Sequence, residues 1–331
     1  MHRGWEIETS RITKYSENIK WIEFQQSSIF NLQYSILLMP TLEALKSKIE
    51  STQDLQSVVK TMKALAAVNI RQYEKAVAAL KEYMQTIEMG LQIALRSRPG
   101  FHISARRAPQ GLLGAVVFGS DQGMCGQLNQ EVAALALESM DGMQVKNANR
   151  RVITIGMRVT NRLADEGQKI QNSLAVPSSV GGITPLVQKL LLAIEDWHAD
   201  TRMNHVLLFY CEQLSGASYR PHRHHLLPVD NQWLQNLRQK EWPTRSLPAF
   251  TMDWDPLFSA LVRQYLFGSL FRAAAESLAS ENASRLASMQ GAERNIAEQL
   301  DDLNRQYHQM RQMAITEELL DIVAGFEALK G

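Results

Sequence analysis

The sequence has few cysteines and no long hydrophobic run, and each absence narrows the class of protein. Two cysteines, Cys125 and Cys211, in 331 residues cannot build a disulfide framework, so the chain suits a reducing compartment. A membrane-spanning helix needs about 18 consecutive apolar residues, and no run in this sequence approaches that length. We therefore expect any attachment to a membrane to come through partner proteins.

The excess of one charge over the other is also small. The chain has 35 basic and 34 acidic residues, and its formal net charge of +1 argues against a general nucleic-acid-binding protein. Apolar residues make up 45% of the sequence and charged residues 21%, which are values typical of globular proteins and argue against wholesale disorder. The length suits one large domain or two modest ones.

Two stripes at helical spacing, one near each end of the chain, are the most informative feature. Within each stripe, mostly apolar side chains recur every three or four residues, which is typical of a long helix that packs one face on a partner. The first stripe consists of Leu55, Val59, Met62, Ala66, Asn69, Tyr73, Ala76, Leu80, Tyr83 and Ile87. The second consists of Met289, Ala292, Ile296, Leu300, Leu303, Tyr307, Met310 and Ala314. We expect the two helices to pair as a long antiparallel coiled-coil hairpin.

Start signals give the limits of both helices. Thr41 can cap a helix over about 42–98. Asp255, with Pro256 at the first helical position, is a strong start for a second helix that continues to about Leu329.

Between the long helices, strand and helix patterns alternate. Strands are expected over about 112–118, 151–156, 206–211 and 219–229. The last of them is predicted to lie at an edge, because Pro221 cannot donate to a strand ladder. Helices are expected over about 128–140, up to Glu166, and over 185–198, with a polar loop over 231–254. This alternation predicts a small, mostly parallel sheet with helices on its faces, a Rossmann-like α/β domain.

The domain organisation follows from these elements. We expect an N-terminal coiled-coil helix over 39–98, an α/β foot domain over 99–254 and a C-terminal coiled-coil helix over 255–331. Residues 1–38 show no sustained periodicity and resemble neither a signal peptide nor a transit peptide. We expect them to be a disordered extension or the product of a misplaced start, with Met39 as the natural N-terminus.

The second long helix should extend past the first. Helices of about 55 and about 74 residues that leave the foot domain together differ by roughly 18 residues, or ~27 Å. The excess falls at about 313–330, which includes Ile315, Leu319, Leu320 and Phe326. A lone helix this apolar is expected to be covered by another protein. The alternative is that this end folds back or frays.

The sequence contains no catalytic or cofactor-binding motif with the required residues and spacing. The Gly119–Gly126 segment lacks the Gly-x-x-x-x-Gly-Lys-Ser/Thr pattern of a phosphate-binding loop and the spacing of a dinucleotide fingerprint. We interpret it as a tight strand-to-helix turn built by Asp121, Gly123, Cys125 and Gly126, with Asp121 bonding backbone amides inside the turn.

Two groups of polar residues lie outside these motifs. His222 and His224 would share one face of a strand beside His225, so a metal is conceivable, but a solvated or interface-facing basic strand is favoured. Arg311 and nearby polar residues lie where the second helix loses its inner partner, and contact with a surrounding protein competes with simple solvation. We expect no cofactor, metal or catalytic residue in this chain.

Four segments resemble one known family. MRQMAITEELLDIVAGFEAL is similar to the C-terminal signature of the gamma subunit of F-type ATP synthases. SKIESTQDLQSVVKTMKALAA, GSDQGMCGQLN and ESLASENASRLASM resemble the N-terminal helix, the glycine-containing turn and a conserved helical segment of the same family. The resemblance covers roughly 42–331, in the right order.

This resemblance implies a rotor. In the family, the helical hairpin turns inside a ring of alpha and beta subunits, and the foot sits on the membrane ring of c subunits beside epsilon. Rotation couples ion translocation to ATP synthesis or hydrolysis, and gamma has no active site of its own. By motif position, Met62, Arg311, Gln312 and Thr316 would contact the alpha/beta ring. The location implied is the cytoplasmic face of a bacterial inner membrane, as a peripheral subunit.

Several positions depart from the family pattern. Asp54-Leu55 stands where Asn-Thr is common, Gln122 replaces a basic residue and Glu317 replaces a Gln. These departures resemble the alternate bacterial ATPases that pump Na⁺ or H⁺. Two other interpretations compete with the rotor: a coiled-coil tether or adaptor unrelated to rotation, and a nucleotide-dependent α/β enzyme with helical arms.

Overall fold

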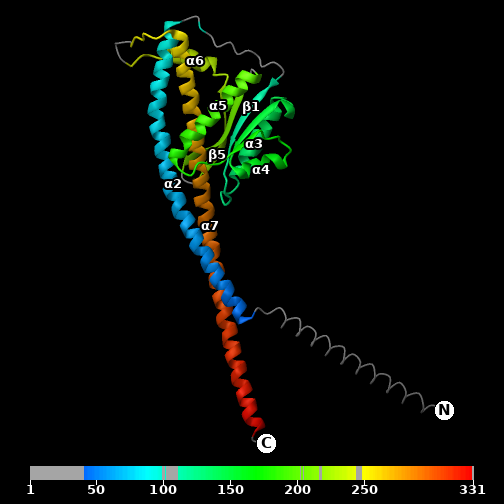
Figure 1. Cartoon of the computed structure of the whole chain (residues 1–331). Coiled ribbons are helices and arrows are strands. Elements are labelled where there is room, and N and C mark those ends of the chain that lie inside the picture. Colours follow the sequence, from blue (N-terminus) through cyan, green and yellow to red (C-terminus); the bar gives the residue numbers. More distant parts are fainter. Residues whose placement is uncertain are drawn as a thin grey trace, which may run out of the picture. The chain divides into compact units, whose positions relative to one another are not determined.

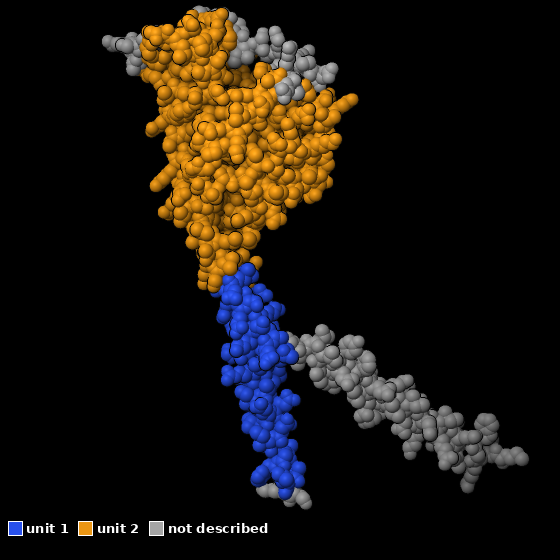
Figure 2. All heavy atoms as spheres, viewed as in Figure 1, with its two compact units in different colours: residues 1–56, 296–331 blue, residues 57–295 orange. Residues whose placement is uncertain are grey.

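The structure is a computed structural model that describes residues 41–98, 101, 111–201, 203, 205–215, 218–243 and 248–329. The extension expected over 1–38 lies outside the described residues. The chain divides into two compact units, one of residues 57–295 and the other of residues 1–56 with 296–331 (Figure 2). The division crosses both long helices, because residues 57–97 of the first and 254–295 of the second belong to the larger unit with the sheet.

The two long helices are α2 (Leu42–Ser97) and α7 (Trp254–Ala328), close to the expected limits (Figure 1). The predicted cap of α2 is confirmed, since the Thr41 Oγ1 accepts the Ala44 N–H at 3.2 Å. Helix α7 begins at Trp254, two residues before Pro256, the predicted first helical position, so Asp255 lies in its first turn and is not its cap. The Asp253 carbonyl accepts the Leu257 N–H at 3.2 Å.

The two helices are antiparallel in the larger unit and pack against each other in the smaller one. In the larger unit, the Lys63 ammonium bonds Glu293 and the Asn69 amide bonds Asn282, so residue numbers fall along α7 as they rise along α2. In the smaller unit, buried side chains of α2 and α7 form an apolar cluster. The cluster consists of Leu45, Ile49 and Leu303, with Leu300, Tyr307 and Met310 packed against it. The predicted hairpin is therefore confirmed.

The prediction of which residues form the first stripe was partly wrong. Leu55 is 52% exposed and Tyr83 is 37% exposed, whereas Ile70 and Met84 are buried. An α-helix drifts by about 20° per heptad relative to a perfect 3.5-residue repeat, so a strict alternation of four and three residues leaves the contact face over several turns.

The predicted sheet is confirmed and has five strands. The strands are β1 (Leu113–Phe118), β2 (Arg150–Ile155), β3 (Asn172–Leu174), β4 (Val206–Ser215) and β5 (Ser218–Leu227). Their order is β3-β2-β1-β4-β5, and all pairs are parallel except β4 with β5. Pro221 lies on the edge strand β5, as predicted, opposite Cys211. Strand β3, with three residues, was not expected.

Helices cover both faces of the sheet. One face packs against α3 (Leu128–Gly142) and α4 (Met157–Asp165). The other packs against α5 (Ile183–Thr201), α7 and Tyr73 of α2. Small side chains such as Ala274 and Ala275 let α7 approach this face closely. No helix among the described residues is long and apolar enough to cross a membrane.

A further helix, α6 (Asn231–Gln239), lies where a polar loop was expected. Asp230 caps it by accepting the Gln232 N–H at 2.8 Å. Leu234 and Leu237 are buried against residues of α2 and α7, which supply the apolar surface that nine residues cannot supply alone.

Candidate functional site

The smaller unit ends in an uncovered stretch of α7. All residues from 311 to 329 are exposed, whereas Met310 still packs against the cluster shared with α2. The exposed side chains include Met313, Ile315, Leu319, Leu320, Ile322, Val323, Phe326 and Leu329. Their exposed fractions run from 45% at Met313 to 88% at Leu329. The predicted extension of the second helix past the first is therefore confirmed for the described residues.

Three of the predicted contact residues lie at the start of this exposed end. Arg311, Gln312 and Thr316 are all exposed. The Thr316 hydroxyl donates to the Gln312 carbonyl at 2.8 Å, a bond within the helix that leaves the side chain of Gln312 facing solvent. Their role in contacting another protein stays a prediction.

The fourth predicted contact residue, Met62, lies on α2 in the larger unit and is partly buried. Next to it, the Lys63 ammonium is 2.5 Å from a Glu293 carboxylate oxygen on α7. The Lys63 hydrogen bond lowers the pKa of Glu293, and the charges of Lys63 and Lys60 act in the same direction. The structure therefore places Met62 beside a charged link between the two helices, in a different unit from Arg311.

The Gly119–Gly126 turn follows β1 and leads into α3. The Asn129 side-chain oxygen accepts the Ser120 N–H at 2.9 Å, and the Ser120 hydroxyl donates to the Gln122 carbonyl at 2.8 Å. The expectation for Asp121 was wrong in one respect. Its two carboxylate oxygens accept the N–H groups of Met157 at 2.9 Å and Val176 at 2.8 Å, which lie outside the turn.

The physical reason is the parallel sheet. Neighbouring parallel strands end at the same edge, so the start of α4 and the loop after β3 come next to the turn after β1. Asp121 therefore joins three separate segments at that edge instead of closing its own turn.

The second half of the turn packs on α7. Cys125 is buried, and its carbonyl accepts the Ser284 hydroxyl at 2.6 Å. Gly126 has φ +59°, and a Cβ there would lie 3.0 Å from the Ser284 Oγ. At Gly123 a Cβ would lie 3.4 Å from an Arg158 guanidinium nitrogen.

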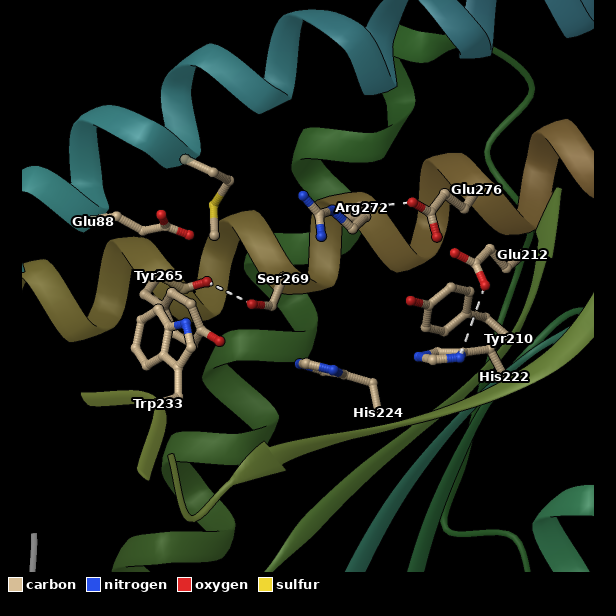
Figure 3. Close-up of a pocket in the computed structure, with 11 residues that line it drawn as sticks. Glu88, Tyr210, Glu212, His222, His224, Trp233, Tyr265, Ser269, Arg272 and Glu276 are labelled. Carbon is tan, nitrogen blue, oxygen red and sulfur yellow. Dashed lines mark hydrogen bonds and ion pairs between the residues drawn. The ribbon is translucent and has the colours of Figure 1, made fainter. Parts of the chain in front are cut away.

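A polar cavity of about 340 Å³ lies in the larger unit between the β4–β5 hairpin and helices α2, α6 and α7 (Figure 3). Its lining consists of Met84, Glu88, Tyr210, Glu212, His222, His224, Trp233, Tyr265, Ser269, Arg272 and Glu276. His222 and His224 both face it, as the shared strand face predicts, and His225 is exposed and outside the lining. Among the described residues, no group of three His, Cys, Asp or Glu side chains is placed to hold a metal ion.

Burial shifts the pKa values of two side chains that line this cavity. It raises the pKa of Glu276 to about 7; the nearby Arg272 guanidinium, 4.0 Å away, opposes that rise and Glu212 adds to it. Burial also lowers the pKa of His224 to about 4, helped by His222 and Arg272. His224 is therefore neutral at pH 7, and its Nε2 and the Glu276 Oε2 are buried without a hydrogen-bond partner.

Sequence reasoning missed both Glu276 and the two serines that follow it on α7, Ser280 and Ser284. The i, i+4 spacing of the serines was visible, since it puts both hydroxyls on one helix face. Nothing local signals Glu276, because its burial depends on the β4–β5 hairpin folding against α7.

The family model and the curated relatives that match this chain carry the name ATP synthase. A family model described as ATP synthase matches residues 41–329. The ATP synthase gamma chain of Nostoc punctiforme is 27% identical over 319 residues, which cover 88% of this chain and 100% of that protein. The ATP synthase gamma chain of Pasteurella multocida is 28% identical over 292 residues, covering 86% and 98%.

Two solved structures share the fold. A chain of the Euglena gracilis mitochondrial ATP synthase, in a structure of OSCP, F1 and c-ring, has a TM-score of 0.54 at 17% identity and covers 87% of this chain and 94% of its own. A chain of the Tetrahymena thermophila mitochondrial central stalk and c-ring has a TM-score of 0.50 at 19% identity, covering 71% and 99%. Because the family model spans most of the sequence, the chain belongs to the ATP synthase family, and the curated relatives that it resembles are gamma chains.

Proposed function

We propose that this chain is the central rotor shaft, the gamma subunit, of an F-type ATP synthase or ATPase. In that role it couples ion translocation through a membrane ring to ATP synthesis or hydrolysis in a ring of alpha and beta subunits. The observation that carries the proposal is the exposed end of α7, residues 311–329, in a chain that belongs to the ATP synthase family.

The chemistry of that end favours a surrounding protein. Eight large apolar side chains between Met313 and Leu329 are 45% to 88% exposed. At roughly 25 cal/mol per Å² of apolar surface, leaving such a helix in water is unfavourable, and covering it on all sides removes the penalty. A sleeve of other subunits covers all sides of a helix, whereas a single docking partner covers one.

The contact residues follow from this arrangement. Arg311, Gln312 and Thr316 offer polar groups to the sleeve where the helix pair narrows to one helix. Met62 lies on α2 beside the Lys63–Glu293 link, which stiffens the pair at that level. A single asymmetric helix contacts three equivalent beta subunits differently, and this difference gives their nucleotide sites different affinities.

The finer assignments belong to the same proposal. The chain contributes no catalytic residue, and its partners are alpha, beta, epsilon and the c-subunit ring. It lies at the cytoplasmic face of a bacterial inner membrane and is held there through the complex. Asp121, Gly123, Cys125 and Gly126 have a structural role, supported by the bonds of Asp121 to two separate segments and of Cys125 to α7.

The test is isolation of the tagged chain from its native cells under conditions that preserve large complexes, with subunit masses and ATPase activity measured on the product. We expect the isolated complex to contain alpha and beta subunits in threefold molar excess over this chain and to hydrolyse ATP. Recovery of the chain alone or with unrelated partners would support a coiled-coil tether instead.

A further inference from the structure

The sheet has a topological switch point between β1 and β4. The chain leaves β1 toward β2 and β3 on one side and returns through α5 to β4 on the other side. In doubly wound sheets, the crevice outside the carboxyl ends of two such strands is where ligands bind. Here β1 ends at Phe118 and continues into the Gly119–Gly126 turn, and Phe209 of β4 pairs with Val117 at the same level.

Side chains of α7 lie in the crevice at the switch point. The Ser280 hydroxyl donates to the carbonyl of Cys211, two residues past Phe209 on β4, at 2.8 Å. The Ser284 hydroxyl donates to the carbonyl of Cys125, in the turn after β1, at 2.6 Å. The exposed fractions of Ser280 and Ser284 are 0% and 5%, so both bonds are shielded from water. One helix therefore binds a carbonyl of β4 that lies just past the level of Val117 and Phe209, and a carbonyl of the turn that follows β1.

Residues around the two serines hold α7 close to the Gly119–Gly126 turn and to α2. Gly126 has φ +59°, and a Cβ at that position would lie 3.0 Å from the Ser284 Oγ, so the turn and the helix are in close contact there. On the same turn of α7, Glu281 and Arg285 form an ion pair at 2.6 Å whose side chains are 7% and 11% exposed. Asn282 accepts a hydrogen bond from Asn69 of α2 at 3.3 Å.

These bonds differ in kind from the apolar contacts that α7 makes with the sheet. Ala273, Ala274 and Leu278 make apolar contacts, which are non-directional and resist separation more than sliding. A hydrogen bond to a fixed carbonyl weakens steeply when its angle changes, so it resists rotation of α7 about its own axis.

We propose that Ser280 and Ser284 are positioning residues that lock α7 to the sheet at the switch point and transmit torque between the foot and the shaft. The proposal deepens the rotor function above and rests on it. In this chain the crevice that holds a ligand in other doubly wound proteins has become a mechanical joint between sheet and helix.

The test uses the whole complex assembled with Ser280→Ala plus Ser284→Ala, which removes both donors without adding bulk. The measured quantity is the number of ions pumped per ATP hydrolysed against an imposed ion gradient, beside ATPase activity without a gradient. We expect ATPase activity within about twofold of the unmodified complex and at least a twofold fall in ions pumped per ATP under load. Ser269→Ala is the matched control, because that buried hydroxyl donates to the Tyr265 carbonyl of its own helix at 2.9 Å, and its loss should leave coupling unchanged.

Unchanged coupling in the double variant, with or without a loss of heat stability, would assign both serines a purely structural role and overturn the proposal. If the double variant does not assemble, Ser280→Ala and Ser284→Ala are measured singly by the same criterion. An unmodified complex that pumps no ions would instead count against the rotor function, so the two failures are distinguishable.

Discussion

Substituting the buried carboxyl group of Glu276 by an amide, Glu276→Gln, gives a stability prediction whose size follows from the structure. Burial raises the pKa of Glu276 from 4.5 to about 7. At ~1.4 kcal/mol per pKa unit, that difference corresponds to about 3 kcal/mol of unfolding free energy. The side chain is only 16% exposed, so solvent screening removes little of it.

The sign follows from linkage. Because the pKa of Glu276 is raised in the folded protein, its contribution to stability is fully present below pH 4.5 and is lost as the pH rises through about 7. Glutamine has the shape of the neutral acid and does not ionise. The variant should therefore match the unmodified chain near pH 4 and exceed its stability by up to about 3 kcal/mol at pH 8.

The assay is denaturant unfolding of the full chain followed by tryptophan fluorescence at a series of pH values. Titration of the groups that do not interact with Glu276 cancels in the difference between the two proteins. A difference that does not change between pH 4 and pH 8, or a variant that becomes relatively less stable at high pH, would refute the reasoning about Glu276.

Three further predictions concern the helices. Deleting the chain from Ile315 onward should weaken assembly with alpha and beta subunits and lower coupling, while circular dichroism and heat stability of the larger unit stay unchanged, because that unit ends at Asn295; full assembly would contradict the sleeve. Combined Arg311→Ala, Gln312→Ala and Thr316→Ala should lower coupled activity without changing the stability of the free chain, since all three are exposed; normal coupled activity would remove their contact role. Gly268→Ala should destabilise the chain by roughly 1–3 kcal/mol, because the new Cβ overlaps the Met84 sulfur, whereas Gly291→Ala on the same helix has nothing within 4 Å and should stabilise by about 0.5–1 kcal/mol; equal unfolding midpoints for the two variants would contradict the packing of α7 on α2.

Much of the fold could be predicted because its signals are local and repeated. The second stripe reports the packing face of α7 residue by residue as far as Met310, and Thr41 reports the start of α2. Pro221 marks the edge strand because proline has no backbone N–H to donate to a neighbouring strand. The rotational drift that displaced Leu55 and Tyr83 from the core accumulates over many turns of the helix, and a fixed repeat does not capture it.

What could not be predicted depends on contacts between distant segments. Helix α6 is fixed from outside, since Gln92 and Arg96 of α2 bond carbonyls at its end. The two amides that Asp121 accepts belong to residues far along the chain, so no turn pattern could name them. The histidine pair was placed on one face correctly, but the cavity it faces is closed by α7.

The most direct test of the rotor is observation of this chain turning. The complex would be immobilised through its beta subunits, with a probe attached to the foot domain, and ATP added. The account predicts rotation of the probe in one direction, in three steps per turn, with a rate that follows ATP hydrolysis. ATP hydrolysis by the intact complex with a stationary or randomly reversing probe would contradict the account.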